Sequence, residues 1–470
     1  MTCKILIEKT LFETRIATLQ DDTLTDLILT TDATPSKVGA IYLGRVARFS
    51  DSMDAAFIDL GHGTDGVLFG SHTSPGKAAK KSSPITEKLT EGEKCLVQII
   101  KDAKGDKGLQ LSTFIELSEQ FVILKPQASG ITFSRKIKDE EFRSKVTQLI
   151  TPLDGGYVIR SSALNHPTRI LQEQALHLHR IWAGIATAID KDSKPRRLLA
   201  ATPEALMAAQ TATGPDVKIL TNDAQTYQQI KTALAAQSNT TIGLALQTAG
   251  TEPLFDQFQI EDQVSAASDM RLPLPRGGNI TIEETEALCV IDVNSGATGK
   301  LAGLKSAARQ INEEAARLAL AQIRLRNISG IIIIDFIQMA GKDQNRALEE
   351  LLKNLAKSDP CPVRIIGMTE LGLMQLTRQR KSPPLSAAMT TPVSCGTDSV
   401  PQQYVATFIR DVQRFAATSK CTRLAIQTSR RLAPLLRTHQ THIESSLNLT
   451  INWTVSPALY GYNYRLDDDR

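Results

Sequence analysis

The sequence is poor in cysteine, and its cysteines form no recognisable framework. Six are scattered singly along 470 residues, with no C-x-x-C pair. A zinc ribbon needs paired cysteines, and disulfide frameworks belong mainly to small secreted domains. We therefore expect neither kind of site in this chain.

Long apolar runs are also missing. The longest are the size of a strand, far below the ~18–20 residues that a membrane helix needs. The first ten residues, MTCKILIEKT, contain no apolar core long enough for a signal peptide. We expect a cytoplasmic protein without a membrane span.

Charge of one sign does not dominate. The net charge of +4 permits a polyanionic partner but does not predict one, so a case for nucleic acid must rest on local features. Hydrophobic residues make up 41% and charged residues 22%, which is typical of globular domains. A chain of 470 residues should form roughly two to four such domains.

The sequence pattern changes several times along the chain. Short β-rich runs separated by turns over residues 37–117 predict a small β-barrel. Strand–helix repeats over about 270–380 predict an α/β domain. The remaining segments are mixed strands and a helix at 118–200, alternating helices and strands at about 201–266, a linker rich in Pro, Ser and Thr at 382–400, and an α+β module at 401–470.

Two aspartates end apolar strands within the α/β segment. Asp292 follows Ala287–Ile291 in EALCVIDVNSGATGK, and Asp335 follows four isoleucines in SGIIIIDFIQM. An isoleucine run of that kind is typical of a parallel strand buried on both faces. A helix is predicted over roughly 304–327, between the two strands. Strand, helix and strand of this length predict a right-handed crossover with the strands parallel.

This arrangement brings both aspartates to the edge of the sheet where ligands bind. On neighbouring strands, ~4.8 Å apart, two carboxylates can share a divalent cation. Oxygen ligands suit Mg²⁺ or Mn²⁺, and Asn294 points to the same side as Asp292. Each aspartate taken alone could instead end its strand or cap a helix. The following GATGK does not have the spacing of a phosphate loop.

These motifs carry a family resemblance. IDVNSG, IIIIDF and GLMQLTRQR (372–380) resemble the catalytic domain of the ribonuclease E/G family. VGAIYLGRVARFSDSMDAAFIDLG (38–61) is similar to the S1 domain of that family, and KGLQLST, FVILKP and GGYVIRSS follow in family order. The resemblance covers nearly the whole chain.

The resemblance implies a multidomain α/β fold. Its parts would be a ribonuclease H-like portion (1–36 with 201–268), an S1 barrel of the OB-fold type (37–117), a 5′-sensor region (118–200), a deoxyribonuclease I-like catalytic domain (269–381), a linker that retains a degenerate zinc link (382–400) and a small C-terminal domain (401–470).

The same resemblance implies a Mg²⁺-dependent endoribonuclease. It would cleave single-stranded RNA in RNA processing or decay and leave 5′-phosphate products. Asp292 and Asp335 would hold the metal, which would activate water, and Asn294 would support them. Mn²⁺ could replace Mg²⁺.

Five further residues match RNA-binding positions of the family. Phe57 and Lys107 match the S1 surface, where an aromatic ring stacks a base and a lysine meets phosphate. Arg160 and Ser161, assisted by Arg135, match the 5′-monophosphate site. Without the resemblance, Phe57 would be expected in a core and Arg160 on an ordinary surface.

The chain departs from the family pattern at several positions. Val67 replaces the second S1 aromatic, unless Phe69 substitutes for it. Glu119 stands where the family has a glycine beside its phosphate pocket, and a carboxylate there would repel phosphate. Gln338 and Gln375 stand where acidic residues are common, although neither position is a principal metal ligand.

The zinc link is reduced to Cys395-Gly396. One thiolate per chain cannot build a four-ligand site even from two chains, so we expect no zinc. Any oligomer would form by ordinary packing. Two other functions stay open: a catalytically inactive RNA-binding relative, and a Mg²⁺ phosphodiesterase acting on DNA or small nucleotides.

Overall fold

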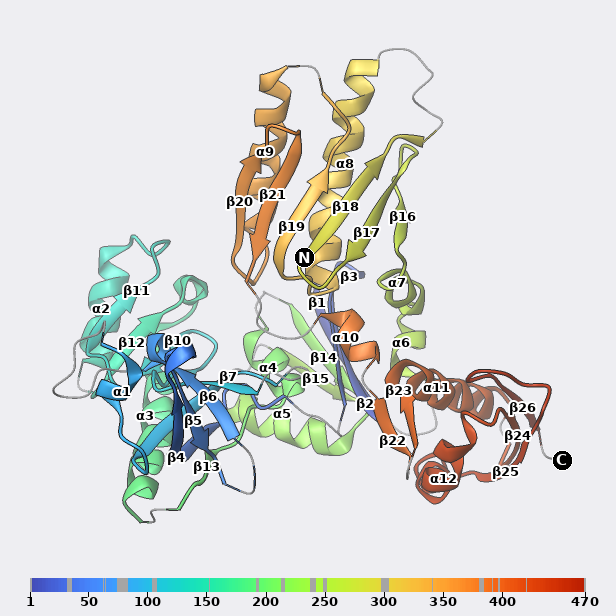
Figure 1. Ribbon diagram of the computed structural model, residues 1–470, viewed down its shortest axis with the longest axis horizontal. Helices are drawn as coiled ribbons and strands as arrows, with labels where there is room; N and C mark the ends of the chain where they lie inside the picture. Colours follow the sequence, from blue (N-terminus) through green and yellow to red (C-terminus); the bar gives the residue numbers. More distant parts are fainter. Residues whose placement is uncertain are drawn as a thin grey trace. The chain divides into compact units, whose positions relative to one another are not determined.

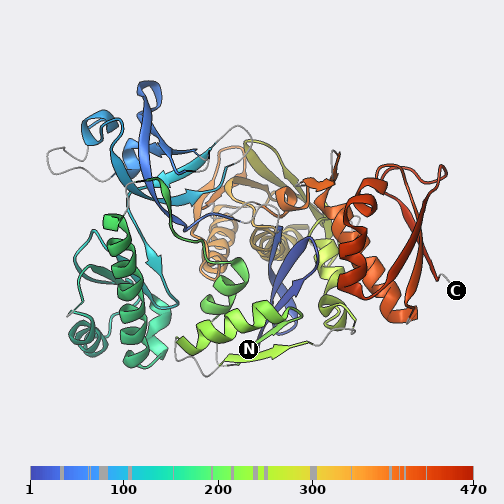
Figure 2. The same ribbon diagram turned by 90° about the horizontal axis from the view of Figure 1, so that it is seen from below.

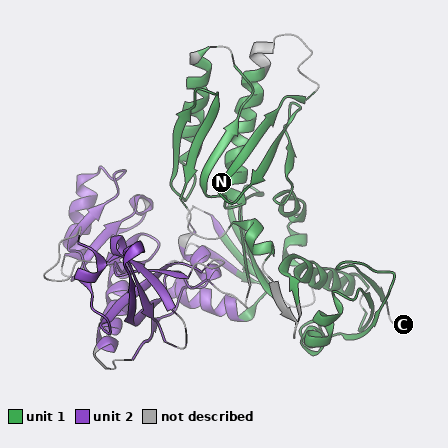
Figure 3. Cartoon of the chain, viewed as in Figure 1, with its two compact units in different colours: residues 1–33, 218–224, 245–470 green, residues 34–217, 225–244 purple. Residues whose placement is uncertain are grey.

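The structure is a computed structural model. It forms two compact units, residues 1–33, 218–224 and 245–470 in one and residues 34–217 and 225–244 in the other (Figure 3). The described residues are 2–31, 36–61, 63, 65–73, 83–103, 108–151, 153–191, 194–212, 216–236, 242–247, 252–296, 304–339, 341–379, 384–390, 392–395, 398–419 and 421–468.

The second unit contains a closed five-stranded barrel, as the sequence predicts. Its strands follow the order β4-β5-β6-β8-β7, and pairing of β7 with β4 closes it. Alternate residues such as Ala56, Ile58 and Leu68 fill its core. The barrel elements are β4 (Ile41–Ser50), η1 (Asp51–Met53), β5 (Ala55–Asp59), β6 (Asp65–Phe69), η2 (Gly70–His72), α1 (Ile85–Lys88), β7 (Lys94–Lys101), β8 (Leu109–Ser112) and β13 (Arg196–Leu199), which pairs with β4.

The same unit contains a four-stranded sheet, whose strands follow β8 of the barrel in the sequence. Their order in the sheet is β11-β12-β10-β9. Apolar residues of α2 and α3 pack with this sheet in one core. The elements of this layer are β9 (Leu117–Ser118), β10 (Val122–Lys125), β11 (Gly130–Phe133), α2 (Glu140–Ile150), β12 (Gly156–Ile159), η3 (Ser161–Asn165) and α3 (Thr168–Lys191). Later in the chain come α4 (Glu204–Thr211) and α5 (Ala224–Ala236), of which α5 lies between β14 and β15 in the sequence.

A five-stranded sheet joins the start of the chain to its middle, in the order β15-β14-β1-β2-β3. Two short helices follow it, and Leu254, Phe255 and Ile260 pack against its apolar side chains. Its elements are β1 (Cys3–Lys9), β2 (Glu13–Gln20), β3 (Thr23–Thr31), β14 (Val217–Thr221), β15 (Ile242–Leu246), α6 (Leu254–Gln257) and α7 (Glu261–Ala266).

A six-stranded mixed sheet carries the two aspartates, in the order β16-β17-β18-β19-β21-β20. Neighbours β18 and β19 run parallel, which confirms the predicted crossover through α8. Helices α8 and α9 lie on the same side of the sheet (Figure 1). The elements are β16 (Arg271–Pro273), β17 (Asn279–Glu284), β18 (Leu288–Asn294), α8 (Leu304–Leu325), β19 (Gly330–Asp335), α9 (Lys342–Ala356), β20 (Val363–Met368) and β21 (Leu373–Arg378).

The isoleucine run of β19 is buried on one face only, so the expectation of burial on both faces is wrong. Ile332 and Ile334 are fully buried under the helices, whereas Ile331 is 52% exposed and Ile333 is half-buried. Both helices pack on one side, which leaves the other side of the sheet open. That open face is where the polar residues of β18 and β19 lie.

The C-terminal part forms a three-stranded sheet with two helices. In both views α11 and α12 lie on the same side of the sheet β25-β24-β26 (Figures 1 and 2). Buried residues of this layer include Phe408, Leu424, Ile426 and Leu436. The elements are α11 (Gln402–Ser419), β24 (Arg423–Thr428), α12 (Ala433–Leu447), β25 (Thr450–Val455) and β26 (Tyr464–Asp468).

The segment expected as a linker, 382–400, contains regular structure. Its described residues form α10 (Leu385–Thr390) and a hairpin of β22 (Pro392–Cys395) and β23 (Asp398–Pro401). Leu385 is buried in the core below the N-terminal sheet, and Val400 is buried in the C-terminal core. Two well-placed apolar residues therefore order a segment whose composition is typical of linkers. The boundaries proposed for the other domains stay predictions.

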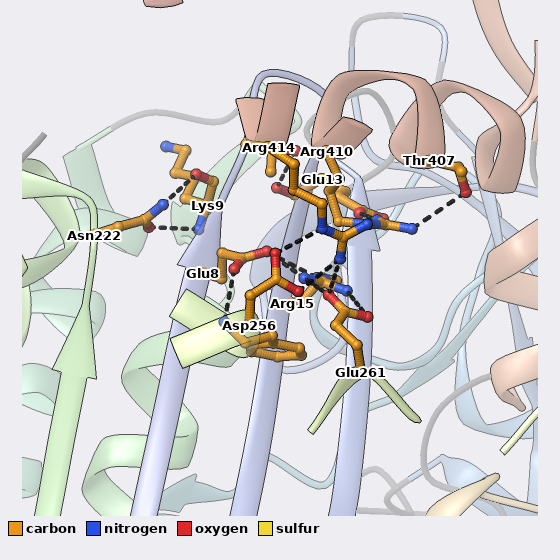
Figure 4. Close-up of polar contacts among 12 residues, drawn as sticks. Glu8, Lys9, Glu13, Arg15, Asn222, Asp256, Glu261, Thr407, Arg410 and Arg414 are labelled. Carbon is orange, nitrogen blue, oxygen red and sulfur yellow. Dashed lines mark hydrogen bonds and ion pairs between the residues drawn. The ribbon is translucent and has the colours of Figure 1, made fainter. Parts of the chain in front are cut away.

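A buried ion cluster ties the hairpin β1–β2 to α6, α7 and α11 (Figure 4). Arg15 Nη2 lies 2.5 Å from Glu8 Oε1 and 2.7 Å from Glu261 Oε1. Arg15 and Glu8 are each 1% exposed, so neither charge is solvated by bulk water. The whole cluster comprises Glu8, Glu13, Arg15, Asp256, Glu261, Arg410 and Arg414.

Candidate active site and nucleic-acid interface

The register of β18 and β19 places Asp292 directly opposite Asp335. Their neighbours Ile291 and Ile334 point into the helical core, so both carboxylates point to the open face. Both aspartates are exposed. Adjacent strands lie ~4.8 Å apart, which lets the two carboxylates approach one cation.

Asn294 lies on the same face, two residues beyond Asp292. Its Nδ2 donates a hydrogen bond of 2.6 Å to Asp292 Oδ2. This contact orients the carboxylate and leaves the amide oxygen of Asn294 as a further acceptor on the open face. The three residues predicted for the metal site are thus brought together.

The donors at this edge are of the kind that Mg²⁺ and Mn²⁺ prefer. They are two carboxylates and one amide, all oxygen ligands. Over the part of the chain that the structure describes, no group of three or more His, Cys, Asp or Glu residues could hold a metal. A cation held by the two carboxylates of Asp292 and Asp335 would keep several coordination positions for water and phosphate, as Mg²⁺ prefers.

A buried amide on α8 holds the loop that follows Asp335. Asn312 is fully buried; its Nδ2 donates to Ile337 O at 2.7 Å, and its Oδ1 accepts from Ile337 N at 3.0 Å. Both backbone groups of Ile337 are satisfied, which fixes the chain two residues beyond the carboxylate. Asn312 was not among the residues predicted from the sequence, although an asparagine beside Ile311 on the buried stripe of a helix is a usable signal.

Within the GLMQLTRQR stretch, Arg378 links β21 to the chain around Asp359 and Ile328. Arg378 is buried; its Nε lies 2.9 Å from Asp359 Oδ2, and its Nη1 donates to Ile328 O at 3.1 Å. Gln375 lies on the open face opposite Ile333. Gln338 is exposed in the loop after β19.

Phe57 faces out of the barrel, so the alternative of a core position is wrong. Its neighbours Ala56 and Ile58 occupy the barrel core, and Phe57 itself is half-buried. The guanidinium carbon of Arg48 lies 3.8 Å from the centre of its ring. An aromatic ring with a cation stacked beside it is suited to a base and its phosphate.

The positions next to Phe57 on this surface differ in character. Val67 pairs with Phe57 across β5 and β6, so an aliphatic side chain stands where the family has its second aromatic. Phe69 lies two residues along β6 on the same face and is half-buried. Lys107, the other predicted contact, lies outside the described residues.

The residues predicted to bind a 5′-phosphate follow the ends of two paired strands. Arg135 comes after β11 and Arg160 after β12; the strands are parallel, and Ser134 N donates to Ile159 O at 2.9 Å. Arg135 is exposed, and Arg160 and Ser161 are half-buried. Burial lowers the pKa of Arg160, and the nearby charge of Glu116 offsets part of this lowering. Arginine remains charged at neutral pH in either case.

Glu119 is buried and held by a histidine of α3. Its Oε1 lies 2.7 Å from Nδ1 of His177, and the side chain of Glu119 is only 4% exposed. One carboxylate oxygen of Glu119 is therefore already engaged by the ring of His177. The sequence did not suggest this contact, because the two residues are 58 positions apart.

No described helix combines the length and the apolar character needed to cross a membrane.

Comparison with known proteins supports the similarity of the motifs. The model of the Ribonuclease E/G family matches residues 116–381, which is more than half of the chain.

Individual relatives extend the match. Ribonuclease G of Escherichia coli (strain K12) is 29% identical over 395 residues, covering 81% of this chain and 80% of that protein. Ribonuclease G of Haemophilus influenzae is 31% identical over 395 residues, covering 80% of this chain and 79% of the relative. Ribonuclease E of Nostoc sp. is 33% identical over 374 residues, 78% of this chain but only 54% of that longer protein. Because the match covers most of the chain at this level of identity, the chain belongs to the ribonuclease E/G family.

Proposed function

We propose that this chain, an endoribonuclease by its family, hydrolyses single-stranded RNA with Mg²⁺ held between Asp292 and Asp335. The observation that carries the proposal is the register that sets the two carboxylates opposite each other on an open sheet face. Curated relatives named Ribonuclease G and Ribonuclease E support RNA as the substrate and RNA processing as the role. We place this activity in the cytoplasm.

Each residue at the site has a distinct task in the proposed reaction. Bound Mg²⁺ would polarise the phosphate and lower the pKa of a water molecule. Asp292 and Asp335 would supply its protein ligands, and Asn294 would keep the Asp292 carboxylate oriented through its hydrogen bond. Attack by water with departure of the 3′-oxygen would leave a 5′-phosphate on the downstream product.

The open face would also let a polymer reach the proposed metal. Helices cover only the opposite side of the sheet, so an extended strand of RNA can lie across β18 and β19. We further propose that the sheet with its helices is the deoxyribonuclease I-like catalytic domain, the N-terminal sheet a ribonuclease H-like portion, and the barrel an S1 domain.

The test is cleavage of matched RNA and DNA oligonucleotides by the purified full chain. We expect RNA to be cut with Mg²⁺ and left intact with EDTA, and the downstream products to carry 5′-phosphate. Equal cutting of the DNA strand would favour a general phosphodiesterase. Binding of RNA without cutting would favour an inactive RNA-binding relative.

The S1 surface gives a separate prediction. Replacing Phe57 with Ala removes the ring on which a base would stack. Such stacking contributes ~1–3 kcal/mol to binding, so we expect RNA to bind about 5- to 150-fold more weakly. Fluorescence anisotropy with labelled oligoadenylate measures the change. Phe114→Ala, which removes an exposed phenylalanine outside the barrel strands, is the matched control. Equal affinities of the two variants would remove Phe57 from the interface.

The proposed 5′-phosphate site gives another testable prediction. Charge-assisted hydrogen bonds contribute ~1.5–3 kcal/mol, so Arg160→Gln should reduce any preference for 5′-monophosphate over 5′-hydroxyl RNA by about 10- to 150-fold. The ratio of kcat/KM values for the two substrates reports this directly. Arg180→Gln, an exposed arginine of α3, should keep the ratio of the unmodified enzyme. A ratio near one in the unmodified enzyme would show that no 5′-end sensing survives beside Glu119.

A further inference from the structure

Three segments meet at the carboxyl end of β24 in the C-terminal part. The loop after β24 is fixed to the loop before β26, because Ser429 Oγ donates to Gly461 O at 2.7 Å and Ser429 N donates to Asn463 O at 3.1 Å. The first turn of α11 joins them through Tyr404, whose ring stacks on Tyr462 at 4.3 Å between centroids. In α/β layers this end of a strand is the usual place for a ligand.

These segments display aromatic rings and arginines to solvent. Tyr460 is 77% exposed and Tyr404 is 39% exposed, so neither ring belongs to the core. Arg430 and Arg431 are exposed side by side in the loop after β24. We name this set, together with Tyr462, the Tyr–Arg cluster.

The charge of the cluster is of one sign. The loops 429–432 (SRRL) and 456–463 (SPALYGYN) contain no acidic residue. Among the described residues, neither Arg430 nor Arg431 has an ion-pair partner. Asp411 of α11, which contacts Tyr464 at the start of β26, is already held by the hydroxyl of Tyr464 at 2.5 Å and by Arg414 at 3.1 Å.

We propose that the Tyr–Arg cluster is a second binding site for single-stranded RNA, distinct from the barrel surface and from the two aspartates. It rests on the proposed function. Exposed tyrosines offer flat faces for bases, and paired arginines meet phosphates. The absence of acidic residues from both loops complements a polyanion, whereas the basic groups of a protein surface would find no matching carboxylate in these loops.

The site predicts a defined salt dependence. Each phosphate that an arginine neutralises on a single strand contributes about 0.7 to the slope of log K against log salt. Replacing Arg430 and Arg431 with Gln should therefore lower that slope by about 1.4. Replacing Tyr460 with Ala should weaken binding by at least about fivefold without changing the slope.

The experiment measures binding of a long fluorescein-labelled oligoadenylate to the full chain by anisotropy, in EDTA so that no RNA is cut. The variants are Tyr460→Ala and the double change Arg430→Gln with Arg431→Gln. Arg423→Gln is the control, since Arg423 is also exposed but starts β24 at its opposite end. We expect both cluster variants to lose affinity and the control to keep it.

The same changes are also made in the Phe57→Ala background. Contacts at separate sites act additively, so the cluster variants should lose affinity by the same factor there. Unchanged affinity and salt slope in all variants would overturn the proposal. So would unchanged RNA affinity with altered self-association in sedimentation, which would assign the cluster to a protein interface. If the cluster variants lose affinity but the unmodified chain does not cleave RNA in Mg²⁺, the cluster is supported and the proposed enzymatic function is contradicted.

Discussion

Replacing Asp335 with Asn should lower the rate of RNA cleavage by on the order of 10³-fold or more. The metal supplies several kcal/mol of charge stabilisation in such reactions, and each factor of ten in rate corresponds to ~1.4 kcal/mol. The substitution keeps the size of the side chain and removes the charge that would hold the proposed cation opposite Asp292. Asp292→Asn should lose activity to a similar degree, because the two carboxylates would act as one site.

The measurement is single-turnover cleavage of labelled RNA at saturating Mg²⁺, with RNA binding measured separately. Glu286→Gln is the matched control: it also removes an exposed carboxylate, but from the turn between β17 and β18, at the other end of the strand from Asp292. We expect that variant to cleave normally. An Asp335→Asn enzyme with the full rate would mean that the aspartates only terminate their strands.

Replacing Arg15 with Ala should lower the free energy of unfolding by ~3–5 kcal/mol. Removing one partner of a buried pair leaves the other charge uncompensated, and that is the costly event. Here Glu8 would keep a carboxylate that is 1% exposed, and within the described part of the chain its one remaining hydrogen bond would be the 3.0 Å bond from Phe255 N to its Oε2. Urea unfolding measures the loss, and hydrogen exchange in β1 and β2 locates it.

Arg309→Ala is the control for this effect. Arg309 pairs with Glu313 on the surface of α8 at 2.8 Å, with both side chains substantially exposed. Exposed helical pairs contribute about 0.3–0.5 kcal/mol, so this variant should be nearly as stable as the unmodified protein. Equal stability of the two variants would show that the buried ion cluster does not hold the N-terminal hairpin.

The positions of Asp292, Asn294 and Asp335 could be predicted because they depend on local patterns. Alternation along a strand puts residues 292 and 294 on one face, and the length of the intervening helix dictates a parallel crossover. The exposure of Ile331 could not be predicted in this way. Hydrophobicity indicates that a residue favours burial, but the number of layers that cover a sheet is decided by the rest of the chain.

Contacts between residues far apart in the sequence could not be predicted either, because they too depend on how the rest of the chain packs. His177 contacts Glu119, and Asn312 holds the backbone of Ile337, yet neither pair follows a periodic pattern. The segment 382–400 shows the opposite error. Its composition indicated a linker, but the burial of Leu385 and Val400 in two separate cores gives it a helix and a hairpin.

Titration of the full chain with Mn²⁺ tests the central claim most directly. Paramagnetic resonance counts bound Mn²⁺ without needing RNA or activity, and Mn²⁺ accepts the same oxygen ligands as Mg²⁺. We predict one ion bound per chain in the unmodified protein and in Glu286→Gln, and its loss in the double variant Asp292→Asn with Asp335→Asn. The same stoichiometry and affinity in that double variant would contradict a metal site between β18 and β19.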